Sequence, residues 1–112
     1  MQKTIEVDGK PVEFKATAST TRRYRQAFNR DFLLDVQKLS ESMSTGQTLS
    51  ASALETFENI AYTMAKQADE SIPDSAEEWL DNFGIFSIYE ILPQILELWG
   101  ISAQPIETGK KK

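Results

Sequence analysis

Three carboxylates, Glu77, Glu78 and Asp81, are the residues of this chain whose spacing could support acid–base chemistry. On a helix, Glu77 and Asp81 lie four positions apart and point the same way, as a catalytic acid and base would need to do. Ser75 precedes them with the spacing of a capping box to Glu78, and acidic side chains in a first helical turn stabilise the helix dipole. We therefore interpret the three carboxylates as capping residues and not as a catalytic site.

The residue types that the chain lacks narrow its chemistry further. It contains no cysteine and no histidine, which removes disulfides, thiolate ligands and the commonest general base and metal ligand. Neither a glycine-rich phosphate loop nor a set of oxygen ligands at calcium-loop spacing is present. We therefore expect a protein that is not an enzyme and that uses no cofactor and no metal. The absence of cysteine fits a reducing cytosol.

Cationic side chains gather in one segment, Arg22 to Arg30, where they are interleaved with aromatic ones. Such a pattern can meet nucleic-acid phosphates, but the net charge of −5 argues against nucleic acid, because nucleic-acid binders carry a basic surface. Arg22, Arg23 and Arg25 also oppose the macrodipole at a helix start, which predicts acidic partners for them. Those partners are carboxylates either of this chain or of another protein.

Charge is distributed unevenly along the chain. Residues 1–40 carry a net charge of +3, residues 41–108 carry −11, and the last four residues add +3. A basic front and an acidic body can attract each other within one molecule or head to tail between copies. A homo-oligomer is therefore one expectation, and a mixed, solvated surface is the alternative.

The N-terminal segment, residues 2–16, has the pattern of a β-hairpin. Polar and apolar residues alternate on both sides of Asp8-Gly9, a dipeptide that tolerates the positive φ angles of a type I′ turn. Pro11 has no backbone donor and suits an edge position, so we expect a loop longer than two residues. The same alternation contains no apolar signal segment, which predicts that the chain is not exported.

Helical periodicity dominates the remainder of the chain. Apolar side chains recur at spacings of three and four, and Ser52, Ser75 and Ser87 each begin a capping box with a glutamate three residues on. These signals predict helices over about 21–43, 52–69, 75–83 and 88–99, with a polar connector over 44–50. The expected fold is mainly α within the α+β class, an N-terminal β-hairpin followed by about four helices in a small bundle. One domain would cover residues 1–100, with a flexible tail over 101–112.

The last predicted helix is apolar over about half of its circumference, with Glu90, Pro93, Gln94 and Glu97 on the other half. Pro93 should bend this helix, because proline inside a helix loses a hydrogen bond and clashes with the preceding turn. A small domain rarely buries so wide a stripe, so we expect part of it to face a partner. The candidate partner-binding residues are Trp79, Phe83, Phe86, Tyr89, Ile95 and Trp99, together with Arg22, Arg23 and Arg25. The alternative for each aromatic residue is a place in the core.

The most hydrophobic window of the chain runs from Ile88 to Trp99. Two glutamates and a glutamine interrupt it, and it is far shorter than the roughly 20 apolar residues that span a bilayer. We therefore expect a soluble protein without membrane contact.

Three short segments of the C-terminal part resemble a known family. They are EWLDNF over 78–83, FSIYEILP over 86–93 and LELW over 96–99. Together they resemble the C-terminal signature of tail assembly chaperones from long-tailed phages (siphoviruses) and prophages. The hairpin and the arginine-rich helix after it are similar to the same family over about residues 1–40, whereas residues 41–74 are generic amphipathic helix with a polar connector.

The resemblance implies a small helical protein that acts in the host cytoplasm and is not part of the mature virion. Its implied partners are the tail tape measure protein, which is long and helical with apolar stripes, and the tail tube protein, reached through a longer form of the chaperone. That longer form commonly arises by programmed ribosomal frameshifting, and codons for Gly109-Lys110-Lys111 suit a slippery sequence. A solvated lysine cluster is the alternative for this ending.

A different class of function also fits the sequence. The chain could be a small regulatory or adaptor domain that associates with DNA through its arginine-rich helix. Binding that needs no protein partner and weakens steeply with salt would distinguish this alternative from the chaperone.

Overall fold

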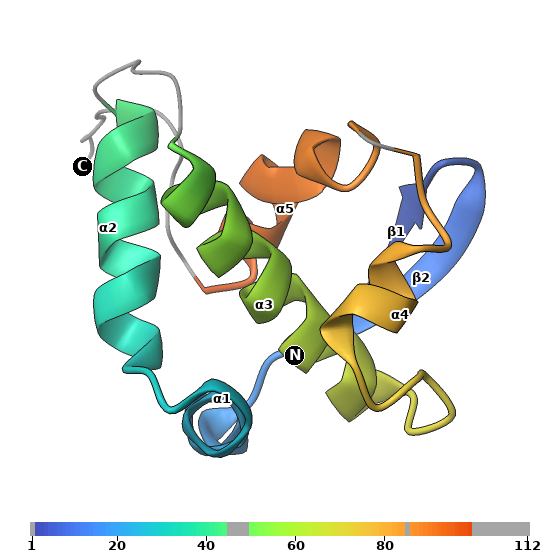
Figure 1. Ribbon diagram of the computed structural model, residues 1–112, viewed down its shortest axis with the longest axis horizontal. Helices are drawn as coiled ribbons and strands as arrows, with labels where there is room; N and C mark the ends of the chain where they lie inside the picture. Colours follow the sequence, from blue (N-terminus) through green and yellow to red (C-terminus); the bar gives the residue numbers. More distant parts are fainter. Residues whose placement is uncertain (1, 45–49, 85, 100–112) are drawn as a thin grey trace, which may run out of the picture.

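The computed structural model of the chain describes residues 2–44, 50–84 and 86–99. A two-stranded antiparallel hairpin is followed by helices that pack into one globule (Figure 1), which confirms the predicted α+β fold class. The elements are β1 (Gln2–Val7), β2 (Lys10–Lys15), α1 (Ala18–Phe28), α2 (Phe32–Ser44), α3 (Ala51–Ala68), α4 (Ala76–Leu80), the 3₁₀ helix η1 (Tyr89–Ile91) and α5 (Leu92–Glu97). Most of the predicted connector and the whole predicted tail lie outside the described residues. Within the described ranges, no helix has the length and apolar character needed to cross a bilayer.

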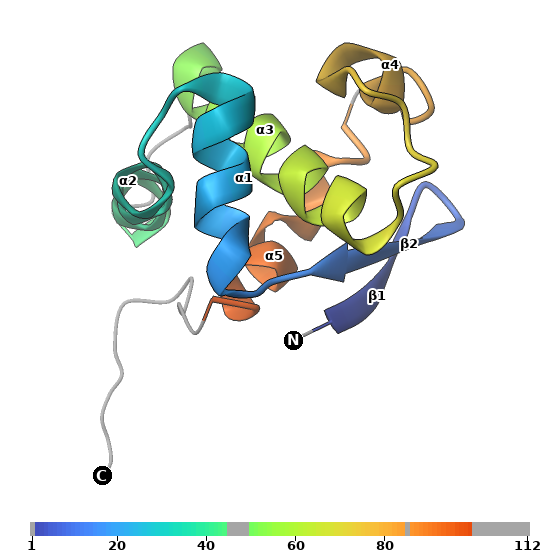
Figure 2. The same cartoon turned by 90° about the horizontal axis from the view of Figure 1, so that it is seen from below.

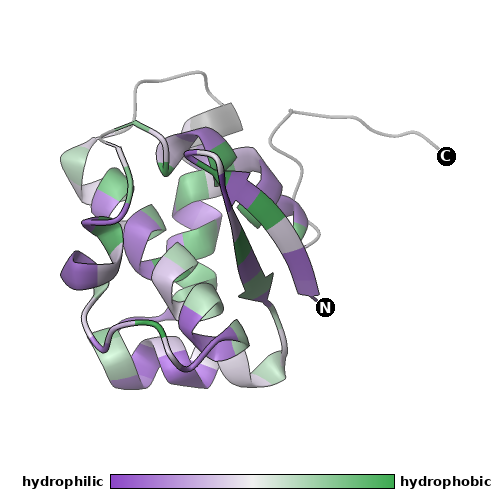
Figure 3. Cartoon of the chain, turned by 90° about the vertical axis from the view of Figure 1, so that its right-hand side faces the viewer, coloured by the Kyte–Doolittle hydropathy of each residue, from purple (hydrophilic) through white to green (hydrophobic). Residues whose placement is uncertain are grey.

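The hairpin turns through two residues, Asp8 and Gly9, whose φ angles are 56° and 77°. Positive φ at both positions is the geometry of a type I′ turn, as the sequence predicts. The loop is not lengthened by Pro11, because Val7 pairs directly with Lys10 and the register continues without a bulge. The expectation of a longer loop is therefore wrong. Hydrophobic and hydrophilic residues alternate along the strands (Figure 3), so that one face of the hairpin packs on α3 and the other meets solvent.

The single helix predicted over residues 21–43 is two helices. Asn29 adopts a left-handed conformation (φ 58°) that ends α1, and asparagine tolerates this conformation better than most residues. Two residues later, Asp31 accepts a hydrogen bond from the backbone N–H of Leu34 at 3.1 Å and so caps the start of α2. The apolar spacing of three and four continues across the break, which is why periodicity alone predicts one helix.

Helix α3 confirms the helix predicted over 52–69, with Ser50 in place of Ser52 as its N-cap. Ser75 caps α4 as predicted, since its Oγ accepts a hydrogen bond from the backbone N–H of Glu78 at 3.4 Å. This helix ends at Leu80, three residues earlier than expected.

The helix predicted over 88–99 is shorter and less regular than expected. It consists of η1 followed by α5, and no side chain caps the start of η1, so the predicted capping box from Ser87 does not form. Pro93 lies in the first turn of α5, where a missing backbone donor costs nothing and the fixed φ favours the helix. The predicted bend at Pro93 is therefore wrong.

Helix α3 is the centre of the core. Figures 1 and 2 show it with α1 and α2 on one side and the hairpin and α4 on the other. Three of its large side chains, Phe57, Ile60 and Met64, have no exposed surface. Its C-terminal end is tied to the start of α1, because Gln67 donates to the Thr17 hydroxyl at 2.7 Å and accepts from the Thr20 hydroxyl at 2.5 Å.

Candidate partner-binding surface

Trp79 lies at the junction of the hairpin, α3 and α4. Its side chain is 3% exposed, and its ring centroid lies 6.4 Å from that of Phe14, 5.9 Å from Tyr62 and 5.1 Å from Phe83. One ring therefore connects strand β2, the middle of α3 and the segment after α4. Trp79 is therefore a core residue, which was the alternative to partner binding in the sequence analysis. A partner cannot contact it in this conformation.

Trp99, at the end of the described chain, contacts two helices, α2 and α3. Its ring centroid lies 4.6 Å from that of Phe32 in α2, and its Nε1 donates a hydrogen bond to the sulfur of Met64 in α3 at 3.4 Å. The residue is only partly buried, so its remaining surface can still meet a partner.

Tyr89 and Ile95 are also held by the fold. The Tyr89 ring packs 6.4 Å from that of Phe57, and its hydroxyl donates a hydrogen bond to the Glu58 carboxylate. That hydrogen bond, with partial burial, raises the pKa of Tyr89 to about 12. Ile95 is completely buried, which removes it from any surface.

The apolar stripe of the C-terminal segment is hidden within the monomer. Its buried members are Ile88, Ile91, Leu92, Ile95, Leu96 and Leu98, while Glu90, Pro93 and Glu97 are exposed. The polar half of the predicted helix is thus confirmed, and the expectation that the domain cannot cover the apolar half is wrong. The reason is that two helices meet this segment: Phe32 of α2 packs on Trp99, and Phe57 of α3 packs on Tyr89.

Phe86 differs from the other candidate aromatics because 74% of its surface is exposed. It lies in the turn between α4 and η1, where the backbone N–H of Tyr89 donates to the Phe86 carbonyl at 3.2 Å. The preceding segment is anchored to the hairpin: the Lys10 ammonium donates to the Asn82 carbonyl at 2.9 Å and lies 5.9 Å from the centre of the partly buried Phe83 ring. The large aromatic side chain of Phe86 therefore faces solvent, and the segment around Asn82 and Phe83 that precedes it is held against the hairpin.

The arginines of α1 form a second exposed group. Arg22, Arg23 and Arg25 all face solvent, and no ion pair involving them is present among the described residues. The Arg23 Nε makes a long hydrogen bond of 3.4 Å to the Ser19 hydroxyl. The first turn of α1 contains no acidic residue, so these cations are not matched by local carboxylates and can meet acidic groups of a partner.

Periodicity did not reveal a polar network between α1 and α2. The Asp35 side chain is 3% exposed, and its carboxylate accepts from Arg30 Nε at 2.7 Å, from Arg30 Nη2 at 2.9 Å and from the Tyr24 hydroxyl at 2.7 Å. The hydrogen bond from Arg30 holds the pKa of Asp35 below its usual value, and burial raises the pKa of Tyr24. The available signal was the position of Asp35 between Phe32 and Leu39, on the apolar face of its helix.

Two exposed leucines were also missed. Leu33 and Leu34 are 66% and 48% exposed at the start of α2. They lie off the stripe of Phe32 and Val36, which the sequence does show. Exposed single leucines are common on soluble proteins and carry no function by themselves.

Of the three carboxylates with which the sequence analysis began, two serve the start of α4, whereas Asp81 is the C-cap residue of this helix, so the first-turn interpretation is wrong for Asp81. Glu77 and Glu78 lie in its first turn and are exposed, as capping residues should be. In the part of the chain that the structure describes, no three potential metal ligands gather at one point. Comparison of the chain with models of protein families, with curated protein sequences and with solved structures finds no match.

Proposed function

We propose that the chain is a tail assembly chaperone that binds the tail tape measure protein in the host cytoplasm and helps to recruit tail tube subunits. The proposal starts from the resemblance carried by residues 78–83, 86–93 and 96–99. It requires no catalytic group, and its partner is an apolar helical protein that needs to be covered before assembly.

The exposure of Phe86 is the observation that supports this proposal most. Within the three segments, Trp79 and most aliphatic residues are buried in the core, so folding accounts for them. Folding does not account for Phe86, whose ring is largely in solvent. Aromatic side chains, phenylalanine included, are enriched in the cores of protein interfaces, because they bury a large rigid surface on association.

The arginines of α1 support a second, electrostatic contact. Arg22, Arg23 and Arg25 are exposed and free of ion pairs within the described part of the chain. On a protein whose net charge is −5, a local cationic group can orient an acidic segment of a partner without making the whole surface basic.

Phe86→Ala tests the proposal, with Leu33→Ala as a matched control that also truncates an exposed apolar side chain. We expect Phe86→Ala to weaken binding to purified tape measure protein by at least about tenfold, because an aromatic anchor is lost. Leu33→Ala should bind as the wild type does. Isothermal titration calorimetry measures both affinities, and thermal unfolding checks that each variant stays folded, as expected for exposed positions.

Equal affinities for the wild type and Phe86→Ala would remove Phe86 from the contact. Failure of the wild-type protein to bind tape measure protein at all, together with salt-sensitive binding to DNA alone, would replace the chaperone by the adaptor function. A tail tube gene upstream and a tape measure gene downstream are the expected gene neighbours.

A further inference from the structure

The turn between α4 and η1 carries Phe86, and its own hydrogen bonds are short-range. The backbone N–H of Ser87 donates to the Gly84 carbonyl at 3.2 Å, and the backbone N–H of Tyr89 donates to the Phe86 carbonyl at 3.2 Å. Bonds between residues three positions apart shape a turn, but they do not fix where the turn lies relative to the rest of the protein. Contacts with other elements must therefore determine the position of the Phe86 backbone.

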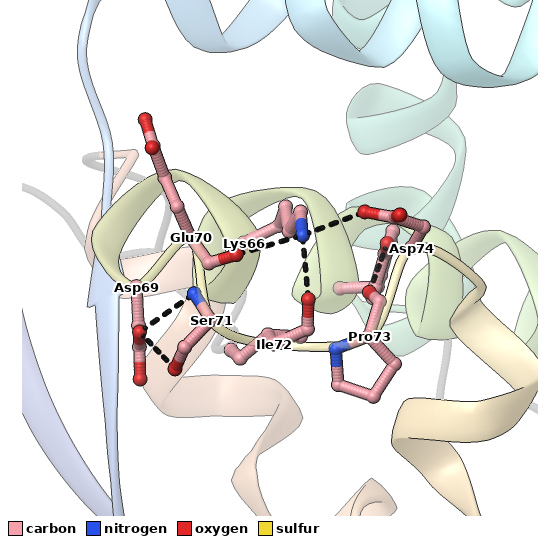
Figure 4. Close-up of polar contacts among 8 residues, drawn as sticks. Lys66, Asp69, Glu70, Ser71, Ile72, Pro73 and Asp74 are labelled. Carbon is pink, nitrogen blue, oxygen red and sulfur yellow. Dashed lines mark hydrogen bonds and ion pairs between the residues drawn. The ribbon is translucent and has the colours of Figure 1, made fainter.

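Helix α4, which leads into the turn, is fixed at its start by a lysine. Lys66 of α3 donates to the carbonyl oxygens of Glu70 and Ile72 at 3.0 and 2.5 Å (Figure 4). Its third bond, of 2.9 Å, goes to the Asp74 carboxylate. These bonds hold the loop between α3 and α4, and the buried Trp79 ring attaches α4 itself to the core. The turn therefore begins from a fixed helix.

The far side of the turn is attached to α3. The Tyr89 hydroxyl donates to the Glu58 carboxylate, and the Tyr89 ring packs on Phe57. The part of the turn from Asn82 to Phe86 lies between this attachment and α4. The position of Phe86 therefore depends on what holds that part.

Lys10 of the hairpin supplies that contact. Its ammonium donates to the Asn82 carbonyl at 2.9 Å and lies 5.9 Å from the centre of the Phe83 ring. Among the described residues, this is the only hydrogen bond between residues 81–88 and a segment distant in sequence. A Cβ atom added to Gly84 would lie 3.9 Å from the Asp8 carboxylate, so the tip of the hairpin is directly beside the turn.

Lys10 is itself held in place by the hairpin. It pairs with Val7 across the type I′ turn, and Val7 is buried in the core. The backbone of Lys10 is therefore anchored, so that its ammonium restrains the turn. A hydrogen bond from a charged donor is also stronger than one between neutral groups.

We propose that Lys10 is a positioning residue for partner binding: it holds the turn against the hairpin, so that the Phe86 ring is presented in a fixed place before the partner arrives. Lys10 acts through Phe86 and does not need to touch the partner. Order in the free protein removes an entropic cost that association would otherwise carry. This role rests on the proposed function, because it requires that Phe86 contacts the tape measure protein.

Lys10→Met tests the proposal, because methionine keeps an unbranched side chain and removes the ammonium. In the free variant, the ¹⁵N order parameters of the Phe86 and Ser87 amides should fall from about 0.85, typical of a rigid backbone, to below about 0.6. Isothermal titration calorimetry should show about tenfold weaker binding of tape measure protein, the effect of one lost charge-assisted hydrogen bond. Thermal unfolding should show that the variant is folded, since Lys10 lies at the surface.

A double variant separates positioning from direct contact. An exposed lysine that bound the partner itself would contribute to affinity with or without the Phe86 ring. If Lys10 acts through Phe86, the variant that combines Lys10→Met with Phe86→Ala should bind as Phe86→Ala alone does, within about twofold. The reason is that the benefit of positioning is lost together with the ring.

Lys66→Met is the matched control. It removes the same charge and more hydrogen bonds than Lys10→Met does, but at the other end of α4. We expect a lower unfolding temperature for Lys66→Met than for Lys10→Met. Its affinity for tape measure protein should equal that of the wild type, because Trp79 keeps the end of α4 in place.

Four results would overturn the positioning role. They are unchanged order parameters in Lys10→Met, unchanged affinity of Lys10→Met, a tenfold loss that persists when Phe86 is also alanine, and equal weakening of binding by Lys66→Met. Failure of the wild type to bind tape measure protein would instead overturn the proposed function, and the role of Lys10 in binding with it. The free protein distinguishes these cases, because the order parameters of Lys10→Met still fall if the function alone is wrong.

Discussion

Trp79→Ala should lower the free energy of unfolding by about 3 to 5 kcal/mol, the usual cost of removing a fully buried tryptophan side chain. The ring contacts Phe14, Tyr62 and Phe83, so its loss opens a cavity between the hairpin, α3 and α4 at once. For a domain of this size, whose total stability is about 5 to 15 kcal/mol, such a loss removes a large share. Urea unfolding followed by far-UV circular dichroism measures the change.

Trp99→Ala is the comparison within the same chain. Trp99 is only partly buried, so its truncation should cost clearly less than that of Trp79. Equal losses of unfolding free energy for the two variants, or a loss below about 1 kcal/mol for Trp79→Ala, would contradict this account. The Trp79 ring would then not join the three elements as its contacts indicate.

Asp35→Ala should lower the free energy of unfolding by about 2 to 3 kcal/mol. The substitution leaves the buried Tyr24 hydroxyl without its acceptor and removes the bidentate contact from Arg30. The loss stays below that expected for a fully buried ion pair, because the Arg30 side chain is 49% exposed and water can replace part of the interaction. Chemical unfolding of the wild type and the variant measures the difference.

The same network predicts how stability depends on pH. The hydrogen bonds from Arg30 hold the pKa of Asp35 below its unfolded value of about 4. A depressed folded pKa stabilises the protein above the unfolded pKa, and this contribution disappears as the pH falls through the folded pKa. The wild type should therefore lose stability below about pH 4 more steeply than Asp35→Asn, and parallel pH profiles for the two proteins would contradict this assignment.

Local signals predicted the elements better than they predicted the breaks between them. Asp8-Gly9 determines its turn by backbone geometry alone, and it was predicted correctly. Asn29 ends α1 although the apolar periodicity continues into α2. The break does carry local signals, because Asn29 tolerates the left-handed conformation and Asp31 caps α2; the apolar periodicity that continues across them concealed both.

The candidate site was harder to predict because burial depends on neighbours that the sequence does not place. The width of the C-terminal apolar stripe was correct, but α2 and α3 both meet it, so most of it became core. Of the predicted aromatic contacts, only Phe86 is largely exposed.

Site-specific photo-crosslinking tests the central claim, that the turn carrying Phe86 is the contact left to a partner once the stripe is buried. A photoreactive phenylalanine analogue at position 86 should crosslink to co-expressed tape measure protein, while the same analogue at the exposed position 33 should not. Crosslinks from position 33 and none from position 86 would contradict the claim.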